Sequence, residues 1–320
     1  MDAIKMANLT NRDLIHNCDS FPNRVSQPVA YAELLESYVL FQHEGKTLGY
    51  LLPKVVEALR ELPDDWHITG SAASLASKHD TFEKRSEALK RTVEKWRDEQ
   101  RFAILKGWRN ELYPCYAGPK NVVFVMERSA CCLFGLVTYG IHMNGYIPAT
   151  DSAPLRMWVP RRSPHKQTYG GMLDNTVAGG ISYPMTPYDT LVKEAEEEAS
   201  LPAELVKKNT KAAGVATYFY ISCSKQGGEG GWLQPEVQYI YDMVIPEGTV
   251  PKPNDNEVES FELLTVEEVK KALAAGEFKP NCALVMIDFF VRHGILTVDN
   301  EPNFIEICAR LHRTLEFPLP

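Results

Sequence analysis

Three glutamates on one predicted helix are the residues of this chain best suited to chemistry. At about 100° per residue, Glu194, Glu197 and Glu198 share one arc of that helix. Glu196 falls outside the arc and is interpreted as an ordinary solvated residue. Like charges at these spacings repel by roughly 0.2–0.5 kcal/mol per pair, so the cluster favours a bound cation. Oxygen ligands indicate Mg²⁺ or Mn²⁺, and the alternative is the charged face of a surface helix.

A pair of glycines, Gly179 and Gly180, precedes this helix at a short distance. Glycine permits positive φ and lets a ligand approach the backbone closely. The pair therefore predicts a tight turn beside the acidic helix. A turn with no role in binding would require the same two residues.

The segment from Gly179 to Leu201 resembles the Nudix box, which places a glycine, a glutamate, an Arg-Glu pair and a Glu-Glu pair at fixed spacings. The positions that match the box are Gly179, Glu194, Glu197, Glu198 and Leu201. Lys193 stands for the arginine and Ser200 for the last glycine. Met185 stands where the box has its first glutamate, which removes one acid from the site.

The resemblance extends over nearly the whole chain, to the Nudix family related to thiamine pyrophosphokinase. The segments that carry it are residues 38–66, 155–162, 166–181, 235–242, 257–269 and 276–294. It implies an α/β/α sandwich with a mixed sheet, preceded by a small α+β domain. The implied activity is hydrolysis of thiamine diphosphate, or of its damaged oxo and oxy forms, to the monophosphate and phosphate.

The expected organisation follows from strands interleaved with helices. Residues 1–120 are predicted to form the family-specific α+β domain, 121–297 the Nudix hydrolase domain and 298–320 a C-terminal extension. Strands are expected near residues 38–42, 47–51, 121–126, 132–143, 155–160, 213–222, 237–245 and 261–264. Helices are expected from residue 53 and near 82–100, 266–275 and 283–293.

The resemblance also assigns roles to the acidic residues. Glu194, Glu197 and Glu198 are expected to hold the metal, with Glu197 and Glu198 counted as catalytic. Superfamily enzymes often draw a further carboxylate from a loop after the box. Glu257 matches the family's Glu-Val segment and is the first choice for the general base. Asp255 and Glu259 are the other candidates on this loop.

Four residues are expected to contact the substrate: Gly179, Gly180, Arg162 and Lys193. Arg162 belongs to a basic run at residues 161–166 in an otherwise acidic chain, and guanidinium groups bind phosphate well. Lysine at position 193 supplies a positive charge but not the two-pronged hydrogen bonding of arginine.

Composition limits the classes of function. The chain has 320 residues and a net charge of −8, which argues against a nucleic-acid surface. Its apolar runs are too short to span a membrane, and its start resembles no secretory signal, so a cytoplasmic location is expected. The seven cysteines are scattered without zinc-ligand spacing and are interpreted as reduced thiols. Monomer and homodimer both stay open.

Two other functions remain open from the sequence. A hydrolase with the same box can act on another nucleoside-linked or coenzyme-linked diphosphate. A degenerate box can serve only to bind a ligand, and Met185 supports this alternative. The retained acidic cluster argues against it, because a pure binding module has little use for three repelling carboxylates.

Overall fold

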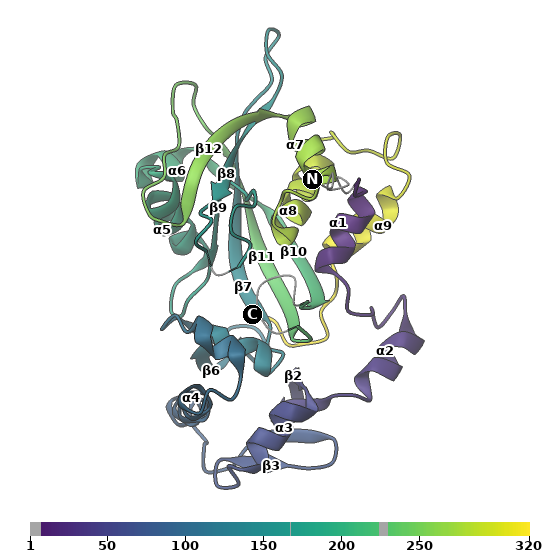
Figure 1. Ribbon diagram of the computed structural model, residues 1–320, viewed down its shortest axis with the longest axis vertical. Helices are drawn as coiled ribbons and strands as arrows, with labels where there is room; N and C mark the ends of the chain where they lie inside the picture. The colour runs from purple at the N-terminus through teal and green to yellow at the C-terminus, as the bar shows by residue number, and fades with distance from the viewer. Residues whose placement is uncertain (1–7, 167, 224–229) are drawn as a thin grey trace, which may run out of the picture.

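A mixed six-stranded sheet forms the centre of the C-terminal part of the molecule (Figure 1). The computed structural model describes residues 8–166, 168–223 and 230–320. The strands of the sheet are β7 (Thr138–Ile147), β8 (Arg156–Arg162), β9 (Val177–Gly180), β10 (Thr210–Ile221), β11 (Leu233–Val244) and β12 (Val258–Thr265). Their order is β10-β11-β7-β8-β12, and β9 pairs with β7. The β11–β7 pair is parallel and the other pairs are antiparallel, so the sheet is mixed as expected.

Helices cover both faces of this sheet (Figure 1). The first face carries α5 (Pro187–Ala199) and α6 (Ala203–Asn209), and the second carries α7 (Val266–Ala274) and α8 (Pro280–Arg292). On the second face, α1 (Asn11–Cys18) packs against α8 and α9 (Phe304–Leu311). Each face has its own cluster of buried apolar side chains. The predicted α/β/α sandwich is therefore confirmed.

A separate hydrophobic core supports the N-terminal part. Its sheet has the order β2-β1-β4-β3 and consists of β1 (Val39–His43), β2 (Lys46–Leu51), β3 (Trp66–Ile68) and β4 (Ala72–Leu75). Its helices are α2 (Pro28–Leu35), α3 (Pro53–Arg60), α4 (Phe82–Asp98) and two 3₁₀ segments, η1 (Ala103–Gly107) and η2 (Arg128–Leu133). The hairpin of β5 (Leu112–Tyr116) and β6 (Val122–Glu127) follows, and the boundary we propose at residue 120 falls in its turn.

Local sequence explains where the expected helices begin. Pro53 occupies the first turn of α3, where a missing N–H costs nothing. The Thr81 side chain accepts a hydrogen bond from the Lys84 backbone N–H and caps α4. The Thr265 side chain and Glu268 form a reciprocal cap at the start of α7.

One expected strand, residues 132–143, is wrong in its first half. Residues Arg128–Leu133 form a 3₁₀ segment, and β7 begins only at Thr138. Gly135 lies between them with a φ of 58°, in the left-handed region that interrupts a strand. A side chain there would also meet the backbone of Tyr50 at 2.6 Å. The apolar sequence at residues 132–143 thus predicts one strand, but the structure has a turn there that packs against β2.

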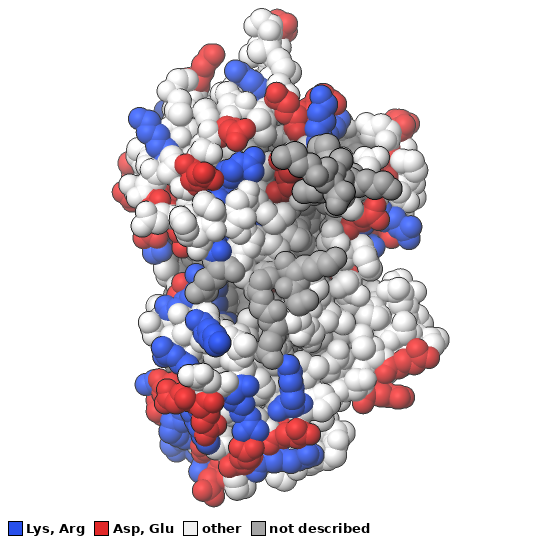
Figure 2. All heavy atoms as spheres, in the orientation of Figure 1, with Lys and Arg blue, Asp and Glu red and all other residues white. Residues whose placement is uncertain are grey.

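The surface carries charges of both signs. On the face shown in Figure 2, basic and acidic side chains lie side by side over the N-terminal part. No helix within the described part of the chain is long and apolar enough to cross a membrane.

Candidate active site

The two glycines of the box lie in a strand, which corrects the expected tight turn. Gly179 and Gly180 belong to β9 and pair with Ile141 and Gly140 of β7. Neither has a positive φ. Glycine is needed here because of close contacts: a Cβ on Gly180 would lie 1.6 Å from the Tyr113 hydroxyl oxygen. A Cβ on Gly179 would lie 2.5 Å from the Glu194 side chain.

Helix α5 carries the acidic residues of the box and follows β9 closely. The Thr186 side chain caps its start, and Leu191, Ala195 and Ala199 are fully buried against the sheet. The helix ends at Ser200, whose φ of 54° is left-handed. This conformation explains why the box usually has glycine at that position.

Glu198 is the glutamate held most firmly against the sheet. Only 8% of the residue is exposed, and its carboxylate accepts a hydrogen bond of 3.1 Å from the Ala178 backbone N–H in β9. Burial, followed by the negative charge of Asp174, raises the pKa of Glu198 well above its usual value. Glu194 and Glu257 add to this repulsion.

The pKa of Glu194 is raised in the same way as that of Glu198. Burial raises its pKa, and the charges of Glu197 and Glu257 raise it further, against the opposing effect of Lys193. Four carboxylates thus lie close together at a partly buried edge of the sheet, which we call the acidic edge: Glu194, Glu197, Glu198 and Glu257. A divalent cation with a preference for oxygen ligands would relieve this repulsion, so the donor set fits Mg²⁺ or Mn²⁺.

Lys193 neutralises part of the acidic cluster. Its ammonium group lies 2.6 Å from a Glu197 carboxylate oxygen and 3.2 Å from one of Glu194. Among the described residues, the glutamates of the box do not form a group whose oxygens all lie within 4.8 Å of one another. The ion pairs of Lys193 thus offset part of the negative charge on this face of α5.

Glu257, the expected general base, lies close to the same edge. It precedes β12 and forms an ion pair with Lys166. Burial opposes ionisation, but the hydrogen bond and charge of Lys166 outweigh it and lower the pKa of Glu257. Asp255 accepts a hydrogen bond from the Glu257 backbone N–H at 2.8 Å, whereas Glu259 is exposed. Because its charge raises the pKa values of Glu194 and Glu198, Glu257 belongs to the acidic edge.

Arg162, expected to contact phosphate, is bound to the protein itself. Its guanidinium donates to a carboxylate oxygen of Asp174 at 2.6 Å and to backbone oxygens of Thr168 and Tyr169. Only 12% of its side chain is exposed. A phosphate contact by Arg162 stays a prediction.

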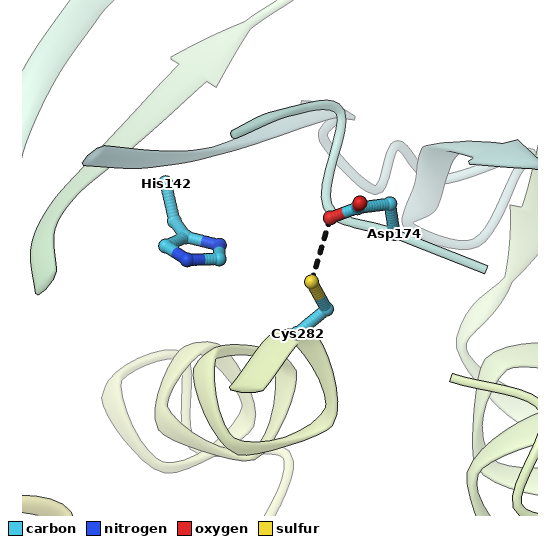
Figure 3. Close-up of side chains that lie close together, drawn as sticks. All are labelled: His142, Asp174 and Cys282. Carbon is cyan, nitrogen blue, oxygen red and sulfur yellow. Dashed lines mark hydrogen bonds between the residues drawn. The ribbon is translucent and has the colours of Figure 1, made fainter. Parts of the chain in front are cut away.

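A second group of potential metal ligands includes Asp174, whose charge acts on Glu198 (Figure 3). One ligand atom each from His142, Asp174 and Cys282 lie within 4.8 Å of one another, and all three residues are buried. His142 comes from β7, Asp174 from the segment before β9 and Cys282 from the first turn of α8. The Cys282 thiol donates to Asp174 at a sulfur–oxygen distance of 2.6 Å.

The charges around this second group disfavour a cation. Asp174 is paired with Arg162, and the positive charge of Lys279 also acts on it. Burial and Lys279 lower the pKa of His142 to about 4, so the imidazole is neutral at pH 7. His142 Nδ1 lies 2.7 Å from the Asn175 side-chain oxygen. The group is therefore a hydrogen-bonded network that already contains its positive charge.

A cavity of about 280 Å³ opens beside the glycine strand. Its lining comes from the sheet, from the start of α8, from α1 and from the N-terminal part. The rings that line it are Tyr113, Tyr139, Tyr169, Tyr220 and Trp232. Its charged side chains are Arg128, Lys279 and Glu236. Gly179 and Gly180 form part of the wall, so the cavity borders the acidic edge.

The cavity contains functional candidates that the sequence did not reveal. Arg128 is paired with Glu111 at 2.9 Å. Lys279 makes no side-chain hydrogen bond or ion pair with the described residues, and it immediately precedes α8. The Lys-Pro step at residues 279–280 was the only available signal, because it marks a helix start.

Two family models match successive parts of the chain. A family described as NUDIX domain matches residues 147–282, and one described as Domain of unknown function (DUF4743) matches residues 15–138. The uncharacterized protein YJR142W of Saccharomyces cerevisiae is 41% identical over 290 residues, covering 88% of this chain and 84% of that protein. Nudix hydrolase 20, chloroplastic, of Arabidopsis thaliana is 35% identical over 295 residues, covering 88% of this chain and 74% of that protein.

Among solved structures, DR0079 from Deinococcus radiodurans is 21% identical, with a TM-score of 0.38 and coverage of 52% of this chain and 91% of that one. The family match and the extended similarity to the plant protein establish the class. The chain belongs to the Nudix hydrolase family and is a Nudix diphosphate hydrolase, as the sequence predicted. Enzymes of this family generally use divalent metal ions.

Proposed function

We propose that this Nudix hydrolase cleaves the diphosphate of thiamine diphosphate, or of its oxo and oxy forms, with Mg²⁺ or Mn²⁺ as cofactor. Water is added across the phosphoric anhydride, and the products are the monophosphate and inorganic phosphate. The sequence resemblance suggests the substrate, and the cavity beside β9 supports it.

The size and lining of this cavity are the observation that carries the proposal. The cavity volume of about 280 Å³ lies just below the range for small-molecule sites, roughly 300–1,000 Å³. This favours one or two small rings over the larger organic group of a dinucleotide or coenzyme A derivative. The partly exposed rings of Tyr169 and Tyr220 can stack on a heterocycle at this place.

The acidic edge supplies the chemistry in this proposal. Glu194, Glu197 and Glu198 would hold the divalent ion, which neutralises phosphate charge and lowers the pKa of a bound water. Lys193 orients Glu194 and Glu197 through its two ion pairs. Glu257, ionised at neutral pH because Lys166 lowers its pKa, accepts the proton of the attacking water.

The role of Glu257 has a direct test. Glu257→Gln should lower kcat by about 10²-fold, because a positioned general base contributes about that much. Glu259→Gln is the matched control, because Glu259 lies two residues further along, in β12, and its side chain is exposed. A loss under threefold for Glu257→Gln would remove it from this role.

The substrate is tested by chromatography of the products formed from a panel of diphosphates, because a nucleotide sugar or a coenzyme A derivative is cleaved to two organic phosphates and releases no inorganic phosphate. The panel contains thiamine diphosphate, its oxo and oxy forms, a nucleotide sugar and a coenzyme A derivative, each with Mg²⁺, Mn²⁺ or EDTA. We expect the highest kcat/KM with a thiamine-type diphosphate and no turnover with EDTA. A higher kcat/KM for the nucleotide sugar or the coenzyme A derivative would contradict the proposed substrate.

A further inference from the structure

One wall of the cavity holds a carboxylate, Glu236, that the hydrolysis chemistry does not use. It lies on β11, whereas the box residues lie on β9 and α5. Among the described residues it forms no ion pair with a lysine, arginine or histidine. A negative charge in a cavity that admits an anionic diphosphate is unfavourable unless the ligand brings a group that the carboxylate can bind.

The hydrogen bonds to Glu236 leave one oxygen poorly satisfied. Oε2 accepts from the Tyr218 hydroxyl at 2.7 Å and from the Gln238 amide at 2.8 Å. Within the described part of the chain, Oε1 accepts one hydrogen bond, from the Tyr220 hydroxyl at 3.4 Å. That distance exceeds the usual 2.5–3.0 Å of O–H···O bonds, and a carboxylate oxygen can accept more than one donor.

Hydrogen bonds from its neighbours hold Glu236 in place, and the positive charge of Arg128 in the same cavity acts on it without an ion pair. Burial and the charge of Glu236 raise the pKa of Tyr218 well above its usual value, so this hydroxyl stays protonated and donates. Gln238 also donates to Tyr218 at 3.0 Å. Gly140 provides the room for the Gln238 amide, because a Cβ there would lie 2.3 Å from its oxygen.

The sheet sets the distance between Glu236 and the glycine strand. The strands β11, β7 and β9 are successive neighbours, and Gln238, Gly140 and Gly180 lie in register across them. Two strand spacings of about 4.8 Å separate Gln238 from Gly180, and Glu236, two residues of about 3.4 Å rise away along β11, lies roughly 12 Å from Gly180. A diphosphate at the acidic edge therefore leaves room for its organic group to reach Glu236.

We propose that Glu236 is a specificity-determining residue, and that its Oε1 accepts a hydrogen bond from an N–H group on the nitrogen heterocycle of the substrate. This inference rests on the proposed function for its choice of substrates. In this proposal, Glu236 on β11 selects a ring that carries an N–H donor. The carboxylates of the acidic edge serve the cleavage of the diphosphate. A substrate whose ring lacks that donor leaves the carboxylate unpaired and binds less well.

The test uses two substrates that differ in one donor: thiamine diphosphate and its analogue with the pyrimidine amino group replaced by hydrogen. The wild-type enzyme should prefer the amino compound by about tenfold or more in kcat/KM. Glu236→Gln should lower kcat/KM for the amino compound by about tenfold, mainly through KM, and change the deamino compound less than twofold. Glu247→Gln, which alters an exposed glutamate beyond β11, should change neither.

Equilibrium binding of the same two compounds separates this inference from the proposed activity. If the wild-type enzyme hydrolyses neither compound but binds the amino form more tightly, and Glu236→Gln removes that preference, the role of Glu236 holds while the proposed reaction fails. Binding of neither compound, or an equal loss for both in the variant, overturns the role. Thermal unfolding checks that Glu236→Gln folds, and Glu236→Asp, with a retracted carboxylate, replaces it if it does not.

Discussion

Two groups of potential metal ligands lie next to each other in this enzyme and differ in their balance of charge. The acidic edge consists of Glu194, Glu197, Glu198 and Glu257, and burial and mutual repulsion raise the pKa values of Glu194 and Glu198. The buried network consists of His142, Asp174 and Cys282, whose ligand atoms lie within 4.8 Å of one another. The comparison shows that short distances between ligand atoms do not by themselves identify a metal site.

The difference arises from the cations that each group already has. Asp174 has Arg162 at 2.6 Å and the charge of Lys279 nearby, so its pKa is lowered in spite of complete burial. Glu198 accepts one hydrogen bond from the described residues, that of the Ala178 backbone N–H. An added divalent ion would relieve repulsion at the acidic edge but would oppose two positive side chains in the buried network.

Replacing Glu198 should have the largest effect on activity. If Glu198 holds the metal as proposed, Glu198→Gln should lower kcat by about 10³-fold or more, because it removes a ligand and a negative charge. The fold should stay intact, since glutamine has the same size and needs no countercharge. Glu196→Gln, on the same helix outside the acidic arc, is the control. A wild-type rate for Glu198→Gln at saturating Mg²⁺ would show that the acidic edge does not hold the metal.

Replacing Asp174 should affect stability first. Asp174→Asn leaves the Arg162 guanidinium buried without its carboxylate, which should cost about 3–5 kcal/mol in the free energy of unfolding. Urea denaturation measures the loss, and EDTA should not change it. Asp189→Asn, at the exposed start of α5, should cost far less. If EDTA destabilised the wild type but not Asp174→Asn, the buried network would be a metal site.

A smaller effect on stability should appear on acidification. Because burial lowers the pKa of His142 from 6.5 to about 4, the unfolded chain binds a proton that the folded protein does not between these two values. The stabilisation from neutral His142 is complete above pH 6.5 and should fall by about 3 kcal/mol as the pH falls to 4. His142→Gln should flatten this part of the profile. An unchanged profile in this variant would refute the assignment.

The three glutamates of α5 could be predicted from the sequence because they repeat with the period of one helix. Glu194, Glu197 and Glu198 lie within two turns of α5, so angular spacing alone separates them from Glu196. The helix starts at Pro53 and Thr81 could be predicted for the same reason, because each depends only on residues within one helical turn. Such features need no knowledge of the tertiary fold.

The buried network and the cavity were not accessible in this way. Asp174 and Cys282 are separated by 108 positions in the chain and meet only because α8 packs on the sheet. Gly180 was expected to form a turn, but its actual constraint is the Tyr113 hydroxyl from the N-terminal part. Contacts of this kind depend on the pairing of distant segments, for which a single sequence has no periodic signal.

Binding of Mn²⁺ tests the central claim most directly, that the acidic edge and not the buried network holds the divalent ion. Electron paramagnetic resonance can measure the dissociation constant for the wild type, Glu198→Gln and Cys282→Ser without any substrate. We expect Glu198→Gln to weaken Mn²⁺ binding at least tenfold and Cys282→Ser to change it less than twofold. Loss of binding in Cys282→Ser, with wild-type affinity in Glu198→Gln, would contradict the account.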